Sequence, residues 1–123
     1  MKKKIIIVED EKPMLKVLTI KLENEGFEIE TASDSDELFQ KLIKEKFDLI
    51  ILDLMLPKMS GFEILEKLKG ESIQTPVIIA SNLSQEEDRK RATELGAVDY
   101  IVKSDTSLVE IVNKIKAFLS EKK

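Results

Sequence analysis

The chain has 123 residues, of which 42% are hydrophobic, and this is enough for one folded domain with a core of its own. Its 20 basic and 24 acidic residues give a net charge of −4, which disfavours binding to nucleic acid. Cysteine and histidine are both absent, which excludes disulfides, thiolate catalysis, the usual zinc sites, Ser-His-Asp triads and any phosphohistidine carried by this chain.

Short apolar runs recur along the chain and predict five strands. Four runs are apolar at nearly every position and rich in β-branched residues, as in strands buried on both faces of a parallel sheet: residues 5–8, 47–52, 77–80 and 98–102. Residues 27–31 alternate between apolar or Thr side chains and acidic ones, which indicates an edge strand. No run approaches the roughly 18 apolar residues of a membrane span, so we expect a soluble cytoplasmic protein.

Amphipathic segments between the strands predict helices. Pro13 marks the start of the first helix, and Gly26 is expected just past its end. Residues 38–43 and 62–69 carry the apolar positions of the second and third helices. Residues 108–118 follow an i, i+3, i+4, i+7 pattern and predict the last helix.

The fourth helix has the weakest apolar face. Ser84 and Glu87 predict a capping box at its start, and few apolar residues follow beyond Ala92 and Leu95. We therefore expect it to be the most loosely docked helix. Five strands that alternate with five helices through short connections predict a doubly wound α/β sandwich around a parallel sheet. Such a sheet binds ligands beyond the carboxyl ends of its strands.

Polar side chains stand at those strand ends. Glu9 and Asp10 follow the first strand, Asp53 the third, Ser81 the fourth and Lys103 the fifth. Clustered carboxylates repel one another unless one binds a proton or a cation, and an all-oxygen site suits Mg²⁺, with Mn²⁺ as a substitute. The lysine adds a positive charge and the serine a hydrogen-bond donor. Together these groups could hold a phosphoryl group on the aspartate at position 53.

Each of these residues also has a structural interpretation. Glu9 and Asp10 could cap the first helix, Asp53 could be a structural strand-end residue, and Ser81 and Lys103 could be ordinary loop residues. Their convergence on one edge of the sheet favours the functional interpretation.

The chain resembles the receiver domain of two-component response regulators over essentially its whole length, and we expect residues 1–123 to form one such domain. The matching stretches are residues 6–11, 48–57, 59–61, 76–81 and 96–103. The resemblance implies a flavodoxin-like sheet in the order 2-1-3-4-5 with five helices. It also implies a signalling domain that catalyses only its own phosphorylation and dephosphorylation.

The resemblance assigns roles to the acidic residues. Asp53 is implied as the phosphoacceptor, which attacks a phosphohistidine on a sensor histidine kinase or a histidine phosphotransfer protein. Asp10, Asp53 and the backbone carbonyl of Met55 are implied as Mg²⁺ ligands, and Glu9 as the holder of a metal-bound water. Lys103 is implied to pair with a phosphoryl oxygen.

The resemblance also implies a switch. Ser81 takes the place of the switch hydroxyl and moves toward the phosphoryl group, after which Tyr100 turns inward. We expect the fourth helix, fifth strand and fifth helix to form the signalling face, which docks an unidentified downstream protein. Receivers often dimerise through this face, so a phosphorylation-dependent homodimer is a further expectation. Gly61 resembles a turn glycine that needs either a positive φ or a close backbone approach.

Two departures from the family pattern bear on the site. Ser104 replaces the proline that usually follows the conserved lysine, so the bond from Lys103 is either trans with a rearranged loop or a strained cis bond. Met55 and Leu83 flank the expected path of the hydrolytic water, and because both are apolar we predict slow self-dephosphorylation.

Three other classes of protein compete with this interpretation. A phosphatase of the haloacid dehalogenase type carries Asp-x-Asp at its nucleophile, whereas this chain has Asp53-Leu54-Met55. A flavin or nucleotide binder needs a Gly/Ser/Thr-rich phosphate loop after the first strand, where this chain has Glu9-Asp10-Glu11. A degenerate receiver that acts only as a phosphorylation-independent interaction module remains the alternative.

Overall fold

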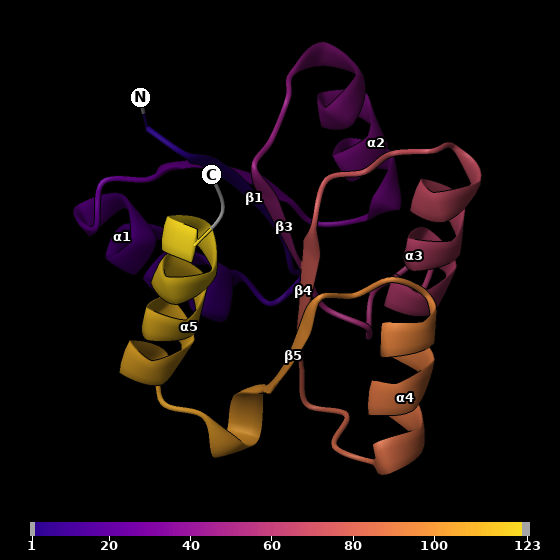
Figure 1. Ribbon diagram of the computed structural model, residues 1–123. Coiled ribbons are helices and arrows are strands. Elements are labelled where there is room, and N and C mark those ends of the chain that lie inside the picture. The colour runs from indigo at the N-terminus through magenta and orange to yellow at the C-terminus, as the bar shows by residue number, and fades with distance from the viewer. Residues whose placement is uncertain (1, 122–123) are drawn as a thin grey trace.

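The computed structural model describes residues 2–121. Its centre is one parallel sheet of five strands in the order β2-β1-β3-β4-β5 (Figure 1). The strands are β1 (Lys4–Val8), β2 (Glu28–Ala32), β3 (Leu49–Leu52), β4 (Val77–Ser81) and β5 (Asp99–Val102). The predicted fold class and strand order are therefore confirmed.

Helices cover both faces of the sheet. α1 (Lys12–Asn24) and α5 (Leu108–Glu121) lie on one face, and α2 (Ser35–Lys44), α3 (Gly61–Gly70) and α4 (Glu86–Glu94) lie on the other (Figure 1). A short 3-10 turn, η1 (Lys103–Asp105), follows β5. Among residues 2–121, no helix has the length and apolar character needed to cross a membrane.

The sheet separates two hydrophobic cores. Ile6, Val8, Ile50 and Leu52 point into the core beneath α2, α3 and α4, and the alternate strand residues point into the core beneath α1 and α5. All four residues of β3 are buried, because both faces of this central strand are covered. The apolar runs of the sequence thus fix the layers that bring the strand ends to one edge.

The first helix ends as predicted. Glu25 is its C-cap residue, and Gly26 adopts a φ of +94°, where a residue with a side chain would be strained.

The predicted capping box at Ser84 is wrong. Gln85 is the N-cap of α4, and no side chain caps the exposed N–H groups of this helix. The Ser-x-x-Glu pattern lies one residue too early for its hydroxyl to reach the first turn. A capping box is instead formed at α3, between Ser60 and Glu63.

Candidate functional site

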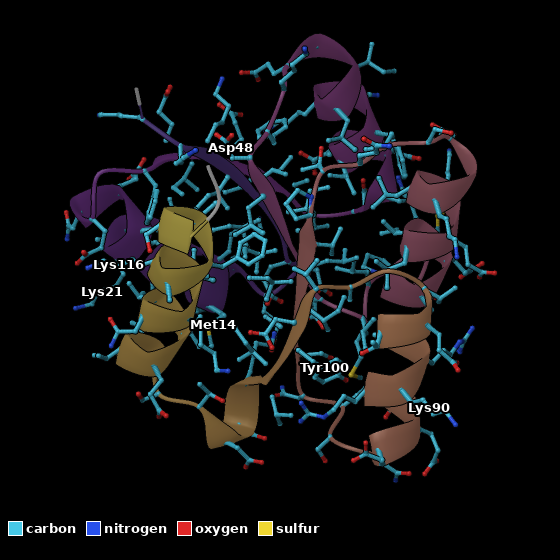
Figure 2. The ribbon with its side chains drawn as sticks, viewed as in Figure 1. Met14, Lys21, Asp48, Lys90, Tyr100 and Lys116 are labelled. Atoms are coloured by element: carbon cyan, nitrogen blue, oxygen red, sulfur yellow. The ribbon has the colours of Figure 1, made fainter. Side chains whose placement is uncertain are left out.

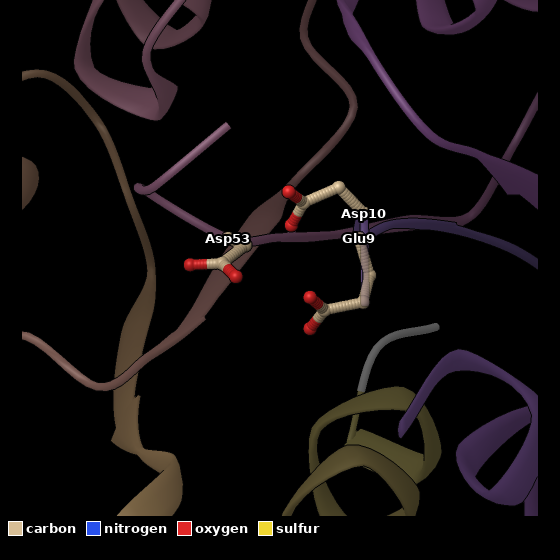
Figure 3. Close-up of side chains that lie close together, drawn as sticks. All are labelled: Glu9, Asp10 and Asp53. Carbon is tan, nitrogen blue, oxygen red and sulfur yellow. The ribbon is translucent and has the colours of Figure 1, made fainter. Parts of the chain in front are cut away.

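Three carboxylates meet at the carboxyl edge of the sheet. Glu9 and Asp10 follow β1 and Asp53 follows β3, and one oxygen of each lies within 4.8 Å of the others (Figure 3). Glu9 and Asp53 are buried, whereas Asp10 is exposed. The three acidic residues predicted at the strand ends are therefore brought together.

The backbone holds this cluster in place. The Asp53 N–H donates to the carbonyl of Val8 at 3.1 Å, so the aspartate continues the pairing of β3 with β1. The Met55 N–H then donates to Asp53 Oδ1 at 3.1 Å, and the Glu11 N–H donates to Glu9 Oε2 at 3.2 Å. Each buried carboxylate thus has one oxygen fixed by the turn that follows its own strand.

Lys103 supplies the counter-charge. Its Nζ donates to Glu9 Oε1 at 2.6 Å and to Asp53 Oδ2 at 3.1 Å, and all three side chains are almost fully buried. Glu11 Oε1 lies 3.8 Å from the same nitrogen but is exposed to solvent. Three carboxyl groups at positions 9, 10 and 53 thus surround one ammonium, so the acidic groups outnumber the basic group by two.

Burial and neighbouring charges shift the pKa values of two groups at the site, Glu9 and Lys103. Burial raises the pKa of the Glu9 carboxyl above its ordinary value, opposed by the hydrogen bond from Lys103 and reinforced by the charge of Asp53. Burial alone would lower the pKa of the Lys103 ammonium, but its hydrogen bond to Glu9 and the charge of Asp53 raise it overall. The lysine is therefore charged at neutral pH, and a divalent cation would offset the remaining negative charge.

The bond between Lys103 and Ser104 is trans, since the described residues include no cis peptide bond. Both residues belong to the 3-10 turn η1, and the Thr106 hydroxyl donates to the carbonyl of Val102 at 2.8 Å. A rearranged loop of this kind was one of the two predicted alternatives, and it keeps the ammonium within the site.

Gly61 is needed for a close approach rather than a positive φ. A Cβ at this position would lie 2.5 Å from the carbonyl oxygen of Asp53 and 2.6 Å from the Cα of Leu54. The Gly61 N–H donates to the Leu54 carbonyl at 2.9 Å. The first turn of α3 therefore packs directly against the backbone that carries the aspartate.

The two predicted switch residues are connected through the backbone of one residue, Leu83. The Leu83 N–H donates to Ser81 Oγ at 3.3 Å, and the Tyr100 hydroxyl donates to the Leu83 carbonyl at 2.7 Å. Ser81 is fully buried and Tyr100 is 6% exposed. The structure thus holds the tyrosine in the inward position that we expected after phosphorylation, and its movement stays a prediction.

Sequence reasoning missed two contacts at the site. It did not pair Glu11 with Lys103, and it did not identify the Leu83 carbonyl as the partner of Tyr100. A charged residue next to the acidic pair was a usable signal for the first contact. No side-chain pattern reports the second, because a backbone carbonyl makes it. Met55 is 57% exposed, and its carbonyl as a metal ligand stays a prediction.

An open five-stranded sheet with an acidic cluster and a buried lysine at its carboxyl edge defines a receiver-type signalling module. Residues 5–116 match the family described as the response regulator receiver domain, and the chain belongs to this family. It is therefore a two-component signalling module rather than a conventional enzyme. Its acidic site is of the kind that binds Mg²⁺ in receivers.

Curated relatives agree with this assignment. The alkaline phosphatase synthesis transcriptional regulatory protein PhoP of Bacillus subtilis (strain 168) is 39% identical over 119 residues, which cover 97% of this chain and 49% of that protein. The chain spans about half the length of the curated relatives it matches.

Solved structures share the fold. The Francisella response regulator 1452 receiver domain matches with a TM-score of 0.91 at 27% identity, over 98% of this chain and 99% of that one. The BeF3-activated receiver domain of DrrB, a Thermotoga maritima protein, matches with a TM-score of 0.86 at 32% identity, over 98% of this chain and 99% of that one.

Proposed function

We propose that the chain is the phosphoacceptor receiver of a two-component phosphorelay and that Asp53 accepts the phosphoryl group. One observation carries this proposal: the Asp53 carboxylate lies 3.1 Å from the buried ammonium of Lys103 and within 4.8 Å of the Glu9 and Asp10 carboxylates. A phosphoryl group on Asp53 would lie next to the buried Lys103 ammonium and next to carboxylates that can bind a metal ion. The alternative, a structural role for each residue, does not account for an excess of negative charge in a partly buried cluster.

The donor set fits Mg²⁺. Asp10 and Asp53 would bind the ion together with the Met55 carbonyl, and Glu9 would hold one of its waters. All these donors are oxygens, and the exposure of Asp10 leaves room for retained water. When bound, the ion supplies positive charge that offsets the repulsion between the carboxylates and an incoming phosphoryl group.

The transfer step is a displacement at phosphorus. A carboxylate oxygen of Asp53 forms a bond to the phosphorus of a phosphohistidine on the partner, and the phosphorus–nitrogen bond breaks with its electron pair staying on the imidazole, which then takes up a proton. Lys103 is already next to Asp53 Oδ2 and would pair with a phosphoryl oxygen. The chain's contribution is mainly positioning and neutralisation of charge.

Phosphorylation of Asp53 is expected to change the structure around the carboxyl ends of β4 and β5. A phosphoryl group on Asp53 adds acceptor oxygens, and the Ser81 hydroxyl would donate to one of them. Leu83 and Tyr100 are linked to this hydroxyl by the hydrogen bonds described above, so the change would reach α4, β5 and α5. A downstream protein, or a second copy of the phosphorylated chain, would bind this face.

A small-molecule phosphodonor tests the proposal. Wild type and Asp53→Asn are incubated with acetyl phosphate and Mg²⁺, and intact mass is measured with and without EDTA. We expect one added phosphoryl group on the wild type only, dependent on Mg²⁺. Asp36→Asn, an exposed aspartate outside the site, is the matched control and should be phosphorylated normally. Equal phosphorylation of Asp53→Asn, or none in wild type, would refute the proposal, and the latter result would favour the phosphorylation-independent interaction module.

Two further parts of the proposal concern context. We propose that residues 1–123 form one receiver domain, since all five strands belong to a single sheet. The phosphodonor would be a sensor histidine kinase or a histidine phosphotransfer protein, and we propose that the exchange occurs in the cytoplasm. Size-exclusion chromatography with and without beryllofluoride tests the expected phosphorylation-dependent homodimer.

A further inference from the structure

Arg89 of α4 stacks on the buried tyrosine. Its guanidinium carbon lies 5.0 Å from the centroid of the Tyr100 ring. Figure 2 shows Tyr100 beside β5, toward α4, where its ring belongs to the core beneath that helix. The ring is therefore held by apolar packing, by the hydroxyl's bond to Leu83 and by a cation over its face.

Few other contacts hold α4. Ala92 is its one buried residue, and no side chain caps its first turn. Each of its two arginines lies over an aromatic ring: Arg89 over Tyr100, and Arg91 over Phe62 of α3 at 4.1 Å. An exposed cation–π contact shifts an equilibrium by about two- to fivefold, which is a large effect for a helix with so little buried surface.

We propose that Arg89 is a positioning residue that couples α4 to the buried state of Tyr100. This inference rests on the proposed function, because it names how the change at Ser81 is transmitted to a helix. The N–H and the carbonyl of Leu83 join Ser81 to the tyrosine, and the guanidinium joins the tyrosine to α4. A movement of α4 that withdraws Arg89 favours release of the ring, and burial of the ring favours the docked position of α4.

The chain carries its own probe for this coupling. Tyr100 is the only tyrosine and tryptophan is absent, so tyrosine fluorescence reports on this ring alone. Acrylamide quenching is compared among wild type, Arg89→Ala, Arg89→Met and Arg89→Lys. Methionine keeps a long side chain without the charge, and lysine keeps the charge. Arg91→Ala is the matched control, because it removes the same type of contact from the same helix but at Phe62.

We expect the quenching constant to rise about two- to fivefold in Arg89→Ala and Arg89→Met, with Arg89→Lys intermediate and Arg91→Ala close to wild type. Quenching in both uncharged Arg89 variants equal to wild type would overturn the inference. An equal rise in Arg91→Ala would also overturn it, because the effect would then be general loosening of α4. Far-UV circular dichroism verifies that each variant is folded.

A second set of titrations, with beryllofluoride and Mg²⁺, separates this inference from the proposed function. Linkage requires Arg89→Ala to bind beryllofluoride about two- to fivefold more weakly than wild type, while Asp53→Asn does not respond. If the wild type does not respond but the Arg89 variants still differ in quenching, the proposed phosphoacceptor role fails and the contact between Arg89 and Tyr100 stands. If the wild type responds and Arg89→Ala binds with unchanged affinity, the coupling fails and the phosphoacceptor role stands.

Discussion

Replacing Gly61 with alanine tests whether the loop after β3 depends on the absence of a side chain. An added Cβ would lie 2.5 Å from the Asp53 carbonyl oxygen and 2.6 Å from the Leu54 Cα, and both are backbone atoms. Non-bonded carbon atoms are normally about 3.5 Å apart or more, so the first turn of α3 and the loop must separate by about 1 Å. This separation moves the backbone that carries the aspartate.

Two effects set the magnitude. Overpacking at a tight site costs about 1–3 kcal/mol. The same movement weakens the hydrogen bond from the Gly61 N–H to the Leu54 carbonyl, which is 2.9 Å long, and a bond of this type contributes about 0.5–1.5 kcal/mol. We therefore expect Gly61→Ala to lower the free energy of unfolding by about 2–4 kcal/mol.

Urea unfolding followed by circular dichroism measures this loss. Gly70→Ala is the matched control: it lies at the other end of α3, an added Cβ meets nothing within 4 Å, and helix propensity predicts a gain of up to about 1 kcal/mol. Phosphorylation by acetyl phosphate should slow in Gly61→Ala and not in Gly70→Ala. A Gly61→Ala protein within about 0.5 kcal/mol of wild type would refute the steric reasoning.

Three further predictions follow from the charges and the loop side chains. Lys103→Met leaves two buried carboxylates without their cation, so the metal-free protein should lose about 3–5 kcal/mol at pH 7 in urea unfolding, and a loss below about 1 kcal/mol contradicts this. The pKa of Glu9 is raised by folding, so the folded state keeps this proton to higher pH than the unfolded chain, and stability falls as pH rises from 4.5 through the folded pKa. Glu9→Gln should remove this decline above pH 4.5, and superimposable pH–stability curves would show that Glu9 does not cause it. Met55→Asn combined with Leu83→Glu should accelerate loss of the phosphoryl group by about tenfold or more, because polar side chains can orient water; a mass time course that matches wild type contradicts this.

Much of the fold could be predicted because the apolar runs are unambiguous. Residues 5–8 and 77–80 have no polar interruption and could only be buried strands, and Gly26 ended the first helix where a positive φ was needed. The predicted strand boundaries were less accurate. β3 begins at Leu49 rather than at position 47, and the Asp48 side chain accepts a hydrogen bond from the Lys4 N–H at 2.8 Å. In a parallel sheet the carboxyl ends of all strands lie at one edge. The residues that follow the strands could therefore be expected to meet there, and the carboxylates and the lysine do.

The details that failed depend on tertiary geometry. The spacing of Ser84 and Glu87 satisfied a local rule, yet the helix starts at Glu86, with Gln85 as its N-cap and no side-chain cap. The stacking of Arg89 on Tyr100 has no sequence signal, since it depends on how an almost wholly exposed helix is rotated. Local patterns therefore predict what is buried, and they do not predict which exposed groups touch.

The ion pair between Glu9 and Lys103 joins residues 94 positions apart, from the segments that follow β1 and β5. During synthesis the ribosome produces the three carboxylates long before it produces this lysine. A nascent chain that lacks β5 therefore has the acidic residues without the lysine that we propose pairs with a phosphoryl oxygen. Competence to receive a signal therefore depends on completion of β5 and η1, so chains that stop before this lysine should not draw phosphate away from longer ones.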